Sequence, residues 1–339
     1  MSDPSNQMNL TLDSRIFVAG HQGMVGSALV RQLRATGHRH VLTRDRADLD
    51  LRDARQVQAY FEAVKPDAVY LAAARVGGIA ANQRLPVEFI QDNLQIQCHV
   101  MQSAFAVGCR RLLFLGSSCI YPRDAAQPMP EEALLSGPLE PTNAPYAIAK
   151  IAGIQMCQSY NREYGASHGM DYRCVMPTNL YGPGDRYHPE HSHVIAALMH
   201  RMQMAREQQA PHVEVWGSGE AMREFLHVDD LARACLTVMQ LSKTAHGRLT
   251  TPERLHLNVG SGEEVSIRSL AQEIARLAGY GGELRFDARR PDGPARKALD
   301  STRLLSLGWR PRFHLASGLA HTWADFVARA QPWSQEVNA

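Results

Sequence analysis

The segment RIFVAGHQGMVGSALVRQL, residues 15–33, decides the fold that we expect for this chain. It begins as a short apolar run typical of a buried strand, and the run ends at Gly20. Gly23 and Gly26 follow, and apolar side chains then recur at the spacing of an amphipathic helix. A strand, a glycine-rich turn and a helix in this order predict a dinucleotide-binding turn, where backbone approaches a pyrophosphate at the helix N-terminus. The GxxGxxG spacing also occurs in ordinary tight turns, and its position at the first strand–helix junction favours a cofactor. The residues of this turn that we expect to contact the cofactor are Gly20, His21, Gln22, Gly23, Met24, Val25 and Gly26.

The alternation of strands and helices continues along the first half of the chain. Apolar runs at residues 40–43, 66–74, 111–115 and 172–176 predict further strands, with helical patterns between them. This rhythm predicts an α/β fold with a doubly wound parallel sheet of the Rossmann type, which binds ligands at the carboxyl ends of its strands. After Gly184 the pattern changes, and a helix near 194–208 with short strands near 213–216 and 255–259 predicts a smaller mixed α/β substrate domain. The expected division is a disordered lead at 1–14, a cofactor domain at 15–182 with 225–245 returning to it, and a substrate domain at 183–224 and 246–330.

The composition limits the partners that we expect. The 339 residues carry a net charge of +2 and are 45% hydrophobic and 21% charged, which is ordinary for a globular chain and gives no basic field for nucleic acid. No apolar run approaches the roughly 20 residues of a membrane-spanning helix, and residues 1–15 lack the pattern of a signal peptide. Six scattered cysteines without a CxxC pair indicate reduced thiols and no metal site. We therefore expect a cytoplasmic protein with no membrane and no nucleic-acid partner.

The choice of cofactor depends on residues 44–46, Arg-Asp-Arg, which follow the second predicted strand. An NAD site usually carries an acidic residue there, which binds the ribose 2′-OH. A guanidinium suits a 2′-phosphate instead, so Arg46 favours NADP, in its reduced form NADPH. The alternative is a solvated charge run, and Asp45 keeps that alternative open.

A second stretch, residues 111–150, carries the side chains that we expect to do chemistry. Tyr146 and Lys150 are four residues apart in a helical pattern, which puts both on one face about one turn apart. A free tyrosine has a pKa near ~10, and a Lys⁺ at ~4 Å with an effective dielectric near 20 is worth about 4 kcal/mol, roughly 3 pKa units. We therefore expect Lys150 to lower the pKa of Tyr146 toward neutrality. A surface tyrosine beside a solvated lysine is the alternative.

Ser117, Ser118 and Cys119 follow Gly116 at the end of the fourth predicted strand. The hydroxyl of Ser117 can orient a substrate carbonyl, with Ser118 as the alternative within the pair. If the backbone stays extended, Ser117 and Cys119 point to the same side, so a thiol faces the same substrate. A free thiol, with a pKa of about 8.5, can abstract a proton from carbon near neutrality. A small buried cysteine is an equally valid interpretation of this position.

Several segments carry a resemblance to a known family. YLAAARVGGIAAN, FLGSSCIYP, LEPTNAPYAIAKIAG, MPTNLYGP and VWGSGEAMREFLHVDDLA, with the glycine turn, resemble the extended short-chain dehydrogenase/reductase family over about residues 15–328. The glycine turn and YxxxK define only the wider superfamily, whereas SSCIYP with the segments around 193 and 216–230 is more specific. The resemblance implies a bifunctional enzyme, commonly a homodimer, that epimerises GDP-4-keto-6-deoxymannose at C3 and C5 and then reduces C4 with NADPH.

The resemblance also implies roles for single residues. Cys119 matches the base of the epimerisation and His193 its acid, whereas a lone histidine is by itself more often structural. Tyr146 donates a proton to the C4 oxygen, Ser117 orients that oxygen, and Lys150 holds the nicotinamide ribose. The residues beyond the glycine turn and Arg46 that it places at the cofactor are Leu115, Gly116, Ser117, Ser118, Lys150, Pro177, Thr178, Asn179, Leu180 and His193. The residues that it places at the GDP-sugar are Arg201, Trp216, Arg223 and Asp292.

The chain departs from the family pattern at Gln22, where some members have an arginine beside the 2′-phosphate, and Arg46 is left with most of the NADP preference. One alternative function is another nucleotide-sugar 4-epimerase or 4,6-dehydratase of the same fold. Dehydratases place an acidic residue near the strand-end Ser, where this chain has Cys119 and Ile120. A second alternative is a non-catalytic NAD(P)-binding regulator, a class that tends to lose the Tyr or the Lys, and this chain keeps both.

Overall fold

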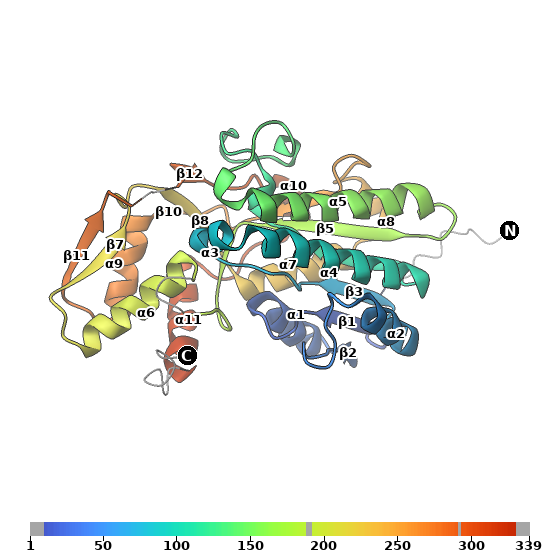
Figure 1. Ribbon diagram of the computed structural model, residues 1–339, viewed down its shortest axis with the longest axis horizontal. Helices are drawn as coiled ribbons and strands as arrows, with labels where there is room; N and C mark the ends of the chain where they lie inside the picture. Colours follow the sequence, from blue (N-terminus) through green and yellow to red (C-terminus); the bar gives the residue numbers. More distant parts are fainter. Residues whose placement is uncertain (1–9, 188–191, 291–292, 330–339) are drawn as a thin grey trace.

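The computed structural model describes residues 10–187, 192–290 and 293–329, and its largest feature is a six-stranded parallel sheet (Figure 1). In spatial order its strands are β2 (His40–Leu42), β1 (Arg15–Ala19), β3 (Ala68–Leu71), β4 (Arg111–Leu115), β5 (Asp171–Pro177) and β9 (His256–Val259). Nearly all residues of the four central strands are buried, because helices cover both faces of the sheet. This is why these strands read in sequence as continuous apolar runs.

Two layers of helices enclose the sheet (Figure 1). One face packs against α1 (Met24–Ala35) and α7 (Val228–Gln240), whose buried residues share a core with the strands. The opposite face packs against α2 (Ala54–Val64), α4 (Pro86–Ala106) and α5 (Ala144–Tyr164). The predicted doubly wound sheet is therefore confirmed, and α7 brings the chain back to it after β8 of the small sheet.

The chain reverses its direction across the sheet beside β1. From β1 it steps outward to β2, and it then crosses to β3 on the other side of β1. In open α/β sheets such a switch point leaves a crevice at the carboxyl ends of the strands, where ligands bind. The glycine turn lies at this crevice, because it follows the last residue of β1.

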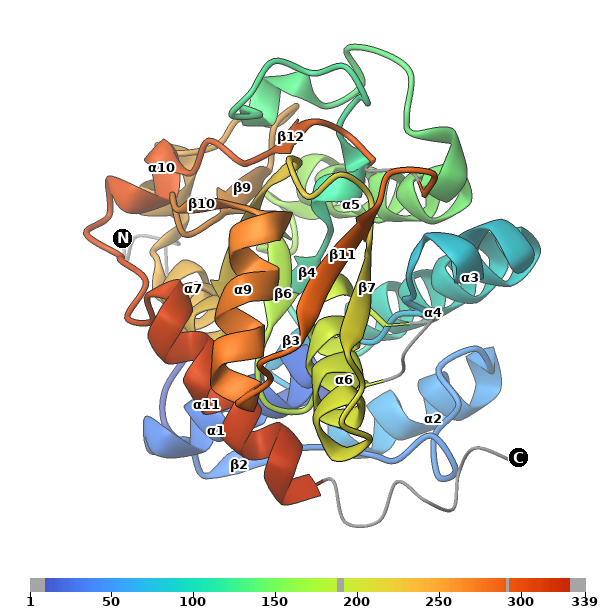
Figure 2. The same ribbon diagram turned by 90° about the vertical axis from the view of Figure 1, so that its left-hand side faces the viewer.

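The smaller unit packs around a third apolar core (Figure 2). Its first sheet has β8 (Met222–His227) between β10 (Glu264–Ser266) and β12 (Arg296–Lys297), and β6 (Asn179–Tyr181) also pairs with β8. A two-stranded parallel sheet joins β7 (His212–Trp216) to β11 (Glu283–Asp287). Its helices are α6 (Val194–Glu207), α9 (Ile267–Ala278) and α11 (Leu315–Arg329). The remaining short elements are α3 (Ile79–Arg84), α8 (Lys243–Gly247), α10 (Thr302–Leu305) and the 3₁₀ turns η1 (Ser118–Ile120), η2 (Glu131–Ala133) and η3 (Pro141–Asn143).

The predicted domain boundaries stay a prediction, and two strands differ from the expected division. Residues 256–259, expected in the substrate domain, form β9 and pair in parallel with β5 in the large sheet. Residues 179–181, expected in the cofactor domain, form β6 and pair with β8 in the small sheet. The chain thus crosses between the two units more often than local patterns indicate. Within the described ranges, no helix is long and apolar enough to cross a membrane.

Candidate active site

The glycine turn fits a dinucleotide because its backbone closes too tightly for side chains. A Cβ on Gly20, whose φ is +84°, would lie 2.7 Å from backbone atoms of Ala73, and one on Gly26 would lie 2.0 Å from the carbonyl oxygen of Gly20. Gly23 caps α1 without a side-chain hydrogen bond, so the first N–H groups of the helix face the crevice as a pyrophosphate requires. The structure thus brings the predicted turn residues 20–26 to the switch point of the sheet.

The turn also contacts the segment after β2. Gln22 Nε2 donates to Asp45 Oδ1 at 3.0 Å, and His21 Nε2 lies 3.1 Å from the same oxygen. Arg46, in the same segment, is exposed. The predicted role of Arg46 stays a prediction, whereas the bond from Gln22 to Asp45 is a feature that the sequence analysis missed.

Tyr146 and Lys150 lie one turn apart in α5, beside the end of β4, as their spacing predicts. Lys150 is 4% exposed, and its Nζ donates to the carbonyl oxygen of Leu115 at 2.8 Å. The same Nζ lies 4.9 Å from the ring centroid of Phe114 and 5.8 Å from that of Tyr146. Burial lowers the pKa of Lys150 from 10.5 to about 8.

The expected lowering of the pKa of Tyr146 by Lys150 is wrong for this structure. Burial raises the pKa of Tyr146, the neighbouring Cys119 raises it further, and a hydrogen bond with Ser117 opposes both. The ammonium of Lys150 does not offset the desolvation, because it points to the Leu115 carbonyl rather than to the phenol oxygen. The Tyr146 hydroxyl is therefore held as a proton donor, next to the Ser117 hydroxyl and the Cys119 thiol.

The backbone after Ser117 differs from the extended path on which the argument for Cys119 relied. Ser117 itself is extended, with φ −159° and ψ 147°, but η1 begins at the next residue. The Ser117 hydroxyl accepts a hydrogen bond from the Cys119 N–H at 3.3 Å and so caps this short turn. Ser118 is turned inward and is 5% exposed, whereas Ser117 and Cys119 are both half-buried. A turn rather than a strand thus brings hydroxyl and thiol to the same side.

Lys297 is a further residue at the site, which the sequence analysis missed. It lies in β12, and its Nζ donates to the Cys119 Sγ at 3.7 Å across 178 residues of chain. An ammonium at this distance stabilises a thiolate over a thiol. The signal available in sequence was the scarcity of lysine, which occurs only at positions 65, 150, 243 and 297.

His193 reaches the same group from α6, where it is the residue before the first helical turn. Its side chain is exposed to solvent, yet the surrounding protein lowers its pKa by desolvation, and the charge of Lys297 adds to this effect. Both effects favour a neutral imidazole. Lys297 therefore contacts the predicted base, Cys119, and acts electrostatically on the predicted acid, His193.

The segment 177–180, expected at the cofactor, is held by Glu224 of β8. Thr178 Oγ1 donates to the Glu224 carbonyl oxygen at 3.2 Å, and Asn179 Nδ2 donates to the same oxygen at 2.9 Å. The Glu224 carboxylate, 1% exposed, accepts from the N–H groups of Gly262 and Leu299 at 2.8 and 2.9 Å. Burial raises the pKa of this carboxyl. Glu224 thus joins the small sheet to the loops that follow β5 and β9.

Two of the four residues expected at the GDP-sugar are in contact. Arg201 lies over the ring of Trp216, with its guanidinium carbon 4.8 Å from the centroid, and Arg290 lies over the same ring at 4.8 Å. The Trp216 side chain is 41% exposed at the end of β7. Arg290 was missed by the sequence analysis because it is one of several arginines in a charged loop. Asp292 lies outside the described residues.

Arg223, the third described residue expected at the GDP-sugar, lies beside Lys297 in the small sheet. It pairs in register with Lys297 on the neighbouring parallel strand. Residues paired in this way present their side chains to the same face of a sheet. Arg223, which suits a phosphate, and Lys297, which contacts the thiol, therefore lie side by side on one face of the small sheet.

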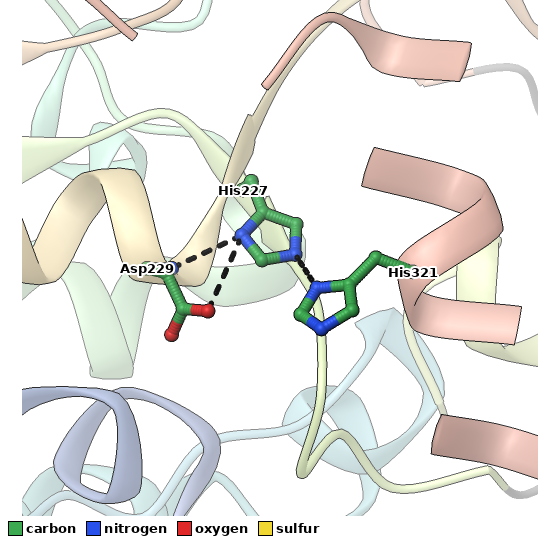
Figure 3. A group of neighbouring side chains, drawn as sticks. All are labelled: His227, Asp229 and His321. Atoms are coloured by element: carbon green, nitrogen blue, oxygen red, sulfur yellow. Dashed lines mark hydrogen bonds and ion pairs between the residues drawn. The ribbon is translucent and has the colours of Figure 1, made fainter. Parts of the chain in front are cut away.

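A separate polar cluster joins α11 to the start of α7 (Figure 3). Among the described residues, His227, Asp229 and His321 each bring one potential metal-ligand atom within 4.8 Å of the others. His227 Nδ1 accepts a hydrogen bond from the Asp229 N–H at 3.2 Å, so its ring proton lies on Nε2, which donates to His321 Nδ1 at 3.2 Å. The His227 ring also stacks on Phe313 at a centroid distance of 3.9 Å. Both ring nitrogens are engaged, so a structural link accounts for the cluster; the expectation of no metal site stays a prediction.

A family model, the NAD dependent epimerase/dehydratase family, matches residues 16–260 of the chain. The chain belongs to this family, and the resemblance stated from the motifs is confirmed. It is 54% identical over 313 residues to the GDP-L-fucose synthase of Escherichia coli (strain K12), an alignment that covers 92% of this chain and 96% of the relative. It is 51% identical over 310 residues to GDP-L-fucose synthase 1 of Arabidopsis thaliana, which covers 91% of this chain and 92% of the relative.

Solved structures agree with this placement. A GDP-L-fucose synthetase from Naegleria fowleri bound to NADP superposes with a TM-score of 0.85 at 26% identity, over 96% of this chain and 98% of that one. The GDP-mannoheptose C4 reductase MlghC from Campylobacter jejuni, with NADP bound, superposes with a TM-score of 0.83 at 32% identity, over 94% and 99% of the two chains. These likenesses extend over both units of the fold. The roles assigned to single residues stay predictions.

Proposed function

We propose that the protein converts GDP-4-dehydro-6-deoxy-D-mannose to GDP-L-fucose, by epimerisation at C3 and C5 and then NADPH-dependent reduction at C4. The observation that carries the proposal is the grouping of Ser117, Cys119 and Tyr146 after β4, with the Lys297 ammonium 3.7 Å from the thiol. A tyrosine and a lysine are sufficient for carbonyl reduction. The thiol beside an ammonium supplies the base that an epimerase also needs.

In the epimerisation, the C4 ketone acidifies the hydrogens on C3 and C5. The thiolate of Cys119 takes one of these protons, and the electron pair of the C–H bond moves into an enolate whose oxygen is the C4 oxygen. A proton delivered to the opposite face of the carbon then inverts it and restores the ketone. His193 is assigned this delivery in its imidazolium form, which the lowered pKa of His193 makes a stronger acid. Lys297 stabilises the thiolate before the proton is taken, and solvent restores both groups between the two carbons.

In the reduction, NADPH bound at the glycine turn would supply the hydride to C4. The Tyr146 hydroxyl gives its proton to the C4 oxygen, and the Ser117 hydroxyl hydrogen-bonds to the same oxygen and orients it. The raised pKa of Tyr146 keeps this proton in place at neutral pH until the oxygen becomes basic. Lys150, buried beside the phenol, balances the tyrosinate that remains.

The two half-reactions give a sharp test with two matched variants. In deuterium oxide with GDP-4-dehydro-6-deoxy-D-mannose, the protein is expected to place deuterium on C3 and C5 and to oxidise NADPH, followed at 340 nm. Tyr146→Phe is expected to stop NADPH oxidation and retain the exchange. Cys119→Ser is expected to suppress the exchange and retain NADPH binding. If the wild-type protein does not oxidise NADPH with this substrate, the proposed function is ruled out.

We infer, further, that the protein acts in the cytoplasm as a homodimer. All six cysteines are free thiols, as a reducing compartment favours. Helices α4 and α5 lie side by side on the outer face of the sheet, and Ile148 of α5 is 48% exposed. Apolar side chains on such a helix pair suit a two-fold contact with a second copy. Sedimentation velocity measures the assembly directly.

A further inference from the structure

The ring of Tyr146 is held by an aromatic contact from α4. The ring of Phe89, near the start of that helix, lies 6.3 Å from the Tyr146 ring, centroid to centroid, at an interplanar angle of 83°. Phe89 is 2% exposed, so this contact is buried. Edge-to-face contacts of this kind favour one relative orientation of the two rings. The orientation of Tyr146 therefore depends on a side chain that has no part in the proposed chemistry.

The loop between β3 and α3 also packs against the Phe89 ring. The guanidinium carbon of Arg75 lies 5.9 Å from the ring centroid, a cation–π distance. A Cβ on Gly77 would lie 3.1 Å from the Phe89 Cζ, so the loop backbone passes close to the far end of the ring. The Phe89 ring is thus in contact with a cation and a backbone segment of this loop as well as with Tyr146.

Polar contacts fix this loop to α4. The Asn93 side chain, 3% exposed, accepts from the Arg75 N–H at 2.9 Å and donates to the carbonyl oxygens of Arg75 and Phe89 at 3.0 and 2.6 Å. The Arg75 guanidinium pairs with Glu88 and, at 3.2 Å, with Asp92, which both belong to α4. The backbone and the side chain of Arg75 are therefore both tied to the helix that carries Phe89.

We propose that Phe89 and Arg75 are positioning residues for the reduction. Arg75, held by α4, fixes the Phe89 ring, and that ring fixes Tyr146 in the orientation from which its hydroxyl reaches the C4 oxygen. The hydrogen bond with Ser117 restrains the Tyr146 hydroxyl, and Phe89 restrains the ring that carries it. Cys119 is held by η1 and contacts Lys297 instead, so the epimerisation does not depend on Phe89. This inference rests on the proposed function and concerns its second step.

The test compares Phe89→Leu with Phe105→Leu. Phe105 lies on the same helix and contacts two tyrosines of α5, Tyr160 and Tyr164, at centroid distances of 5.3 and 4.4 Å. A reacting group displaced by about 1 Å can slow a reaction up to about 100-fold. Phe89→Leu is expected to lower the kcat of NADPH oxidation about tenfold, with both KM values within about threefold of wild type. Phe105→Leu is expected to change kcat by less than about twofold.

Deuterium exchange separates positioning from a general structural effect. Exchange at C3 and C5 is assigned to Cys119, so in Phe89→Leu it is expected to stay within about twofold of wild type. Arg75→Met is expected to lower the kcat of reduction about threefold, and Arg75→Lys, which keeps a cation at the ring, is expected to restore most of it. Crystal structures give a readout without turnover. The Tyr146 ring is expected in one orientation in wild type and Phe105→Leu, and in more than one in Phe89→Leu.

Three results would overturn the inference: equal losses of kcat in the two leucine variants, parallel losses of exchange and reduction in Phe89→Leu, or a single unchanged Tyr146 orientation in Phe89→Leu crystals. If Phe89→Leu does not fold, Arg75→Met decides the question, because its side chain is partly exposed, and an unchanged kcat in that variant overturns the inference. If the wild type does not oxidise NADPH with the sugar, the proposed function fails, and the crystal structures still test the placement of Tyr146.

Discussion

Replacing Lys150 by Met is expected to abolish turnover and to leave the fold at least as stable at pH 7. Burial lowers the pKa of Lys150 from 10.5 to about 8, so keeping it charged in the folded protein costs about 3.4 kcal/mol, at ~1.36 kcal/mol per unit. Met fills the same space near the Phe114 ring without a charge. It leaves the Leu115 carbonyl oxygen without the 2.8 Å bond from Nζ, which costs about 1–3 kcal/mol. The variant should therefore be about 0–2 kcal/mol more stable.

The pH dependence of this difference tests the reasoning. Between pH 8 and 10.5 the unfolded lysine is charged and the folded one is not, so the unfolded state binds more protons and wild-type stability rises with pH. The penalty falls to about 1 kcal/mol by pH 10, and the advantage of Lys150→Met should shrink by about 2 kcal/mol. Urea unfolding at pH 7 and pH 10 measures both quantities. Lys243→Met is the matched control, because exposed Lys243 also donates to a backbone carbonyl, that of Gly165 at 3.0 Å. A variant less stable than wild type by more than about 2 kcal/mol at pH 7, or a difference constant with pH, would refute the estimate.

Two further substitutions test residues that only the structure points out. Lys297→Met removes an ammonium 3.7 Å from the Cys119 sulfur, worth about 1–4 kcal/mol to a thiolate, so iodoacetamide should label Cys119 at least about fivefold more slowly at pH 7. Half-buried Cys98 is the internal control in the same mass spectrum, and an unchanged Cys119 rate contradicts the role of the ammonium. Arg290→Met should weaken GDP binding about tenfold by calorimetry, as loss of a charged hydrogen bond predicts. Arg289→Met is its control, since that guanidinium is paired with a carboxylate 2.7 Å away, and equal losses in both variants would rule out a specific role for Arg290.

The strands of the large sheet could be predicted from the sequence, because the apolar pattern of a buried strand lies within its own residues. A strand that helices cover on both faces is mostly apolar, so the runs at residues 111–115 and 171–177 can be recognised as strands without knowing which strands pair with them. The glycine turn could also be recognised from the sequence. Its backbone leaves no room for a Cβ at Gly20 or Gly26, so both positions require glycine. The order of the strands follows from short connections and consistent handedness.

The remaining features depend on contacts between distant segments, which local periodicity does not record. The apolar run 256–259 fits either sheet equally well, and only its pairing with β5 assigns it. Lys297 meets Cys119 because β12 pairs with β8 and not because of any pattern around residue 297. The turn at η1 was not predicted, because it depends on a local hydrogen bond. The Ser117 hydroxyl accepts from the Cys119 N–H, and this bond favours a turn over an extended backbone.

The pKa of Tyr146 changes how the site is understood. A tyrosine that serves as a base must lose its proton near neutrality, and Lys150 was expected to supply the energy for that ionisation. A tyrosine that completes a reduction must instead keep its proton until the C4 oxygen becomes negative, and a raised pKa does so. The neighbouring Cys119 adds to this effect, because negative charge on its sulfur opposes ionisation of the phenol. In the proposed reaction, a Cys119 thiolate that takes protons from C3 and C5 would therefore hold the phenol beside it protonated. The proposed roles of Cys119 as proton acceptor and Tyr146 as proton donor are therefore mutually compatible, as epimerisation followed by reduction requires.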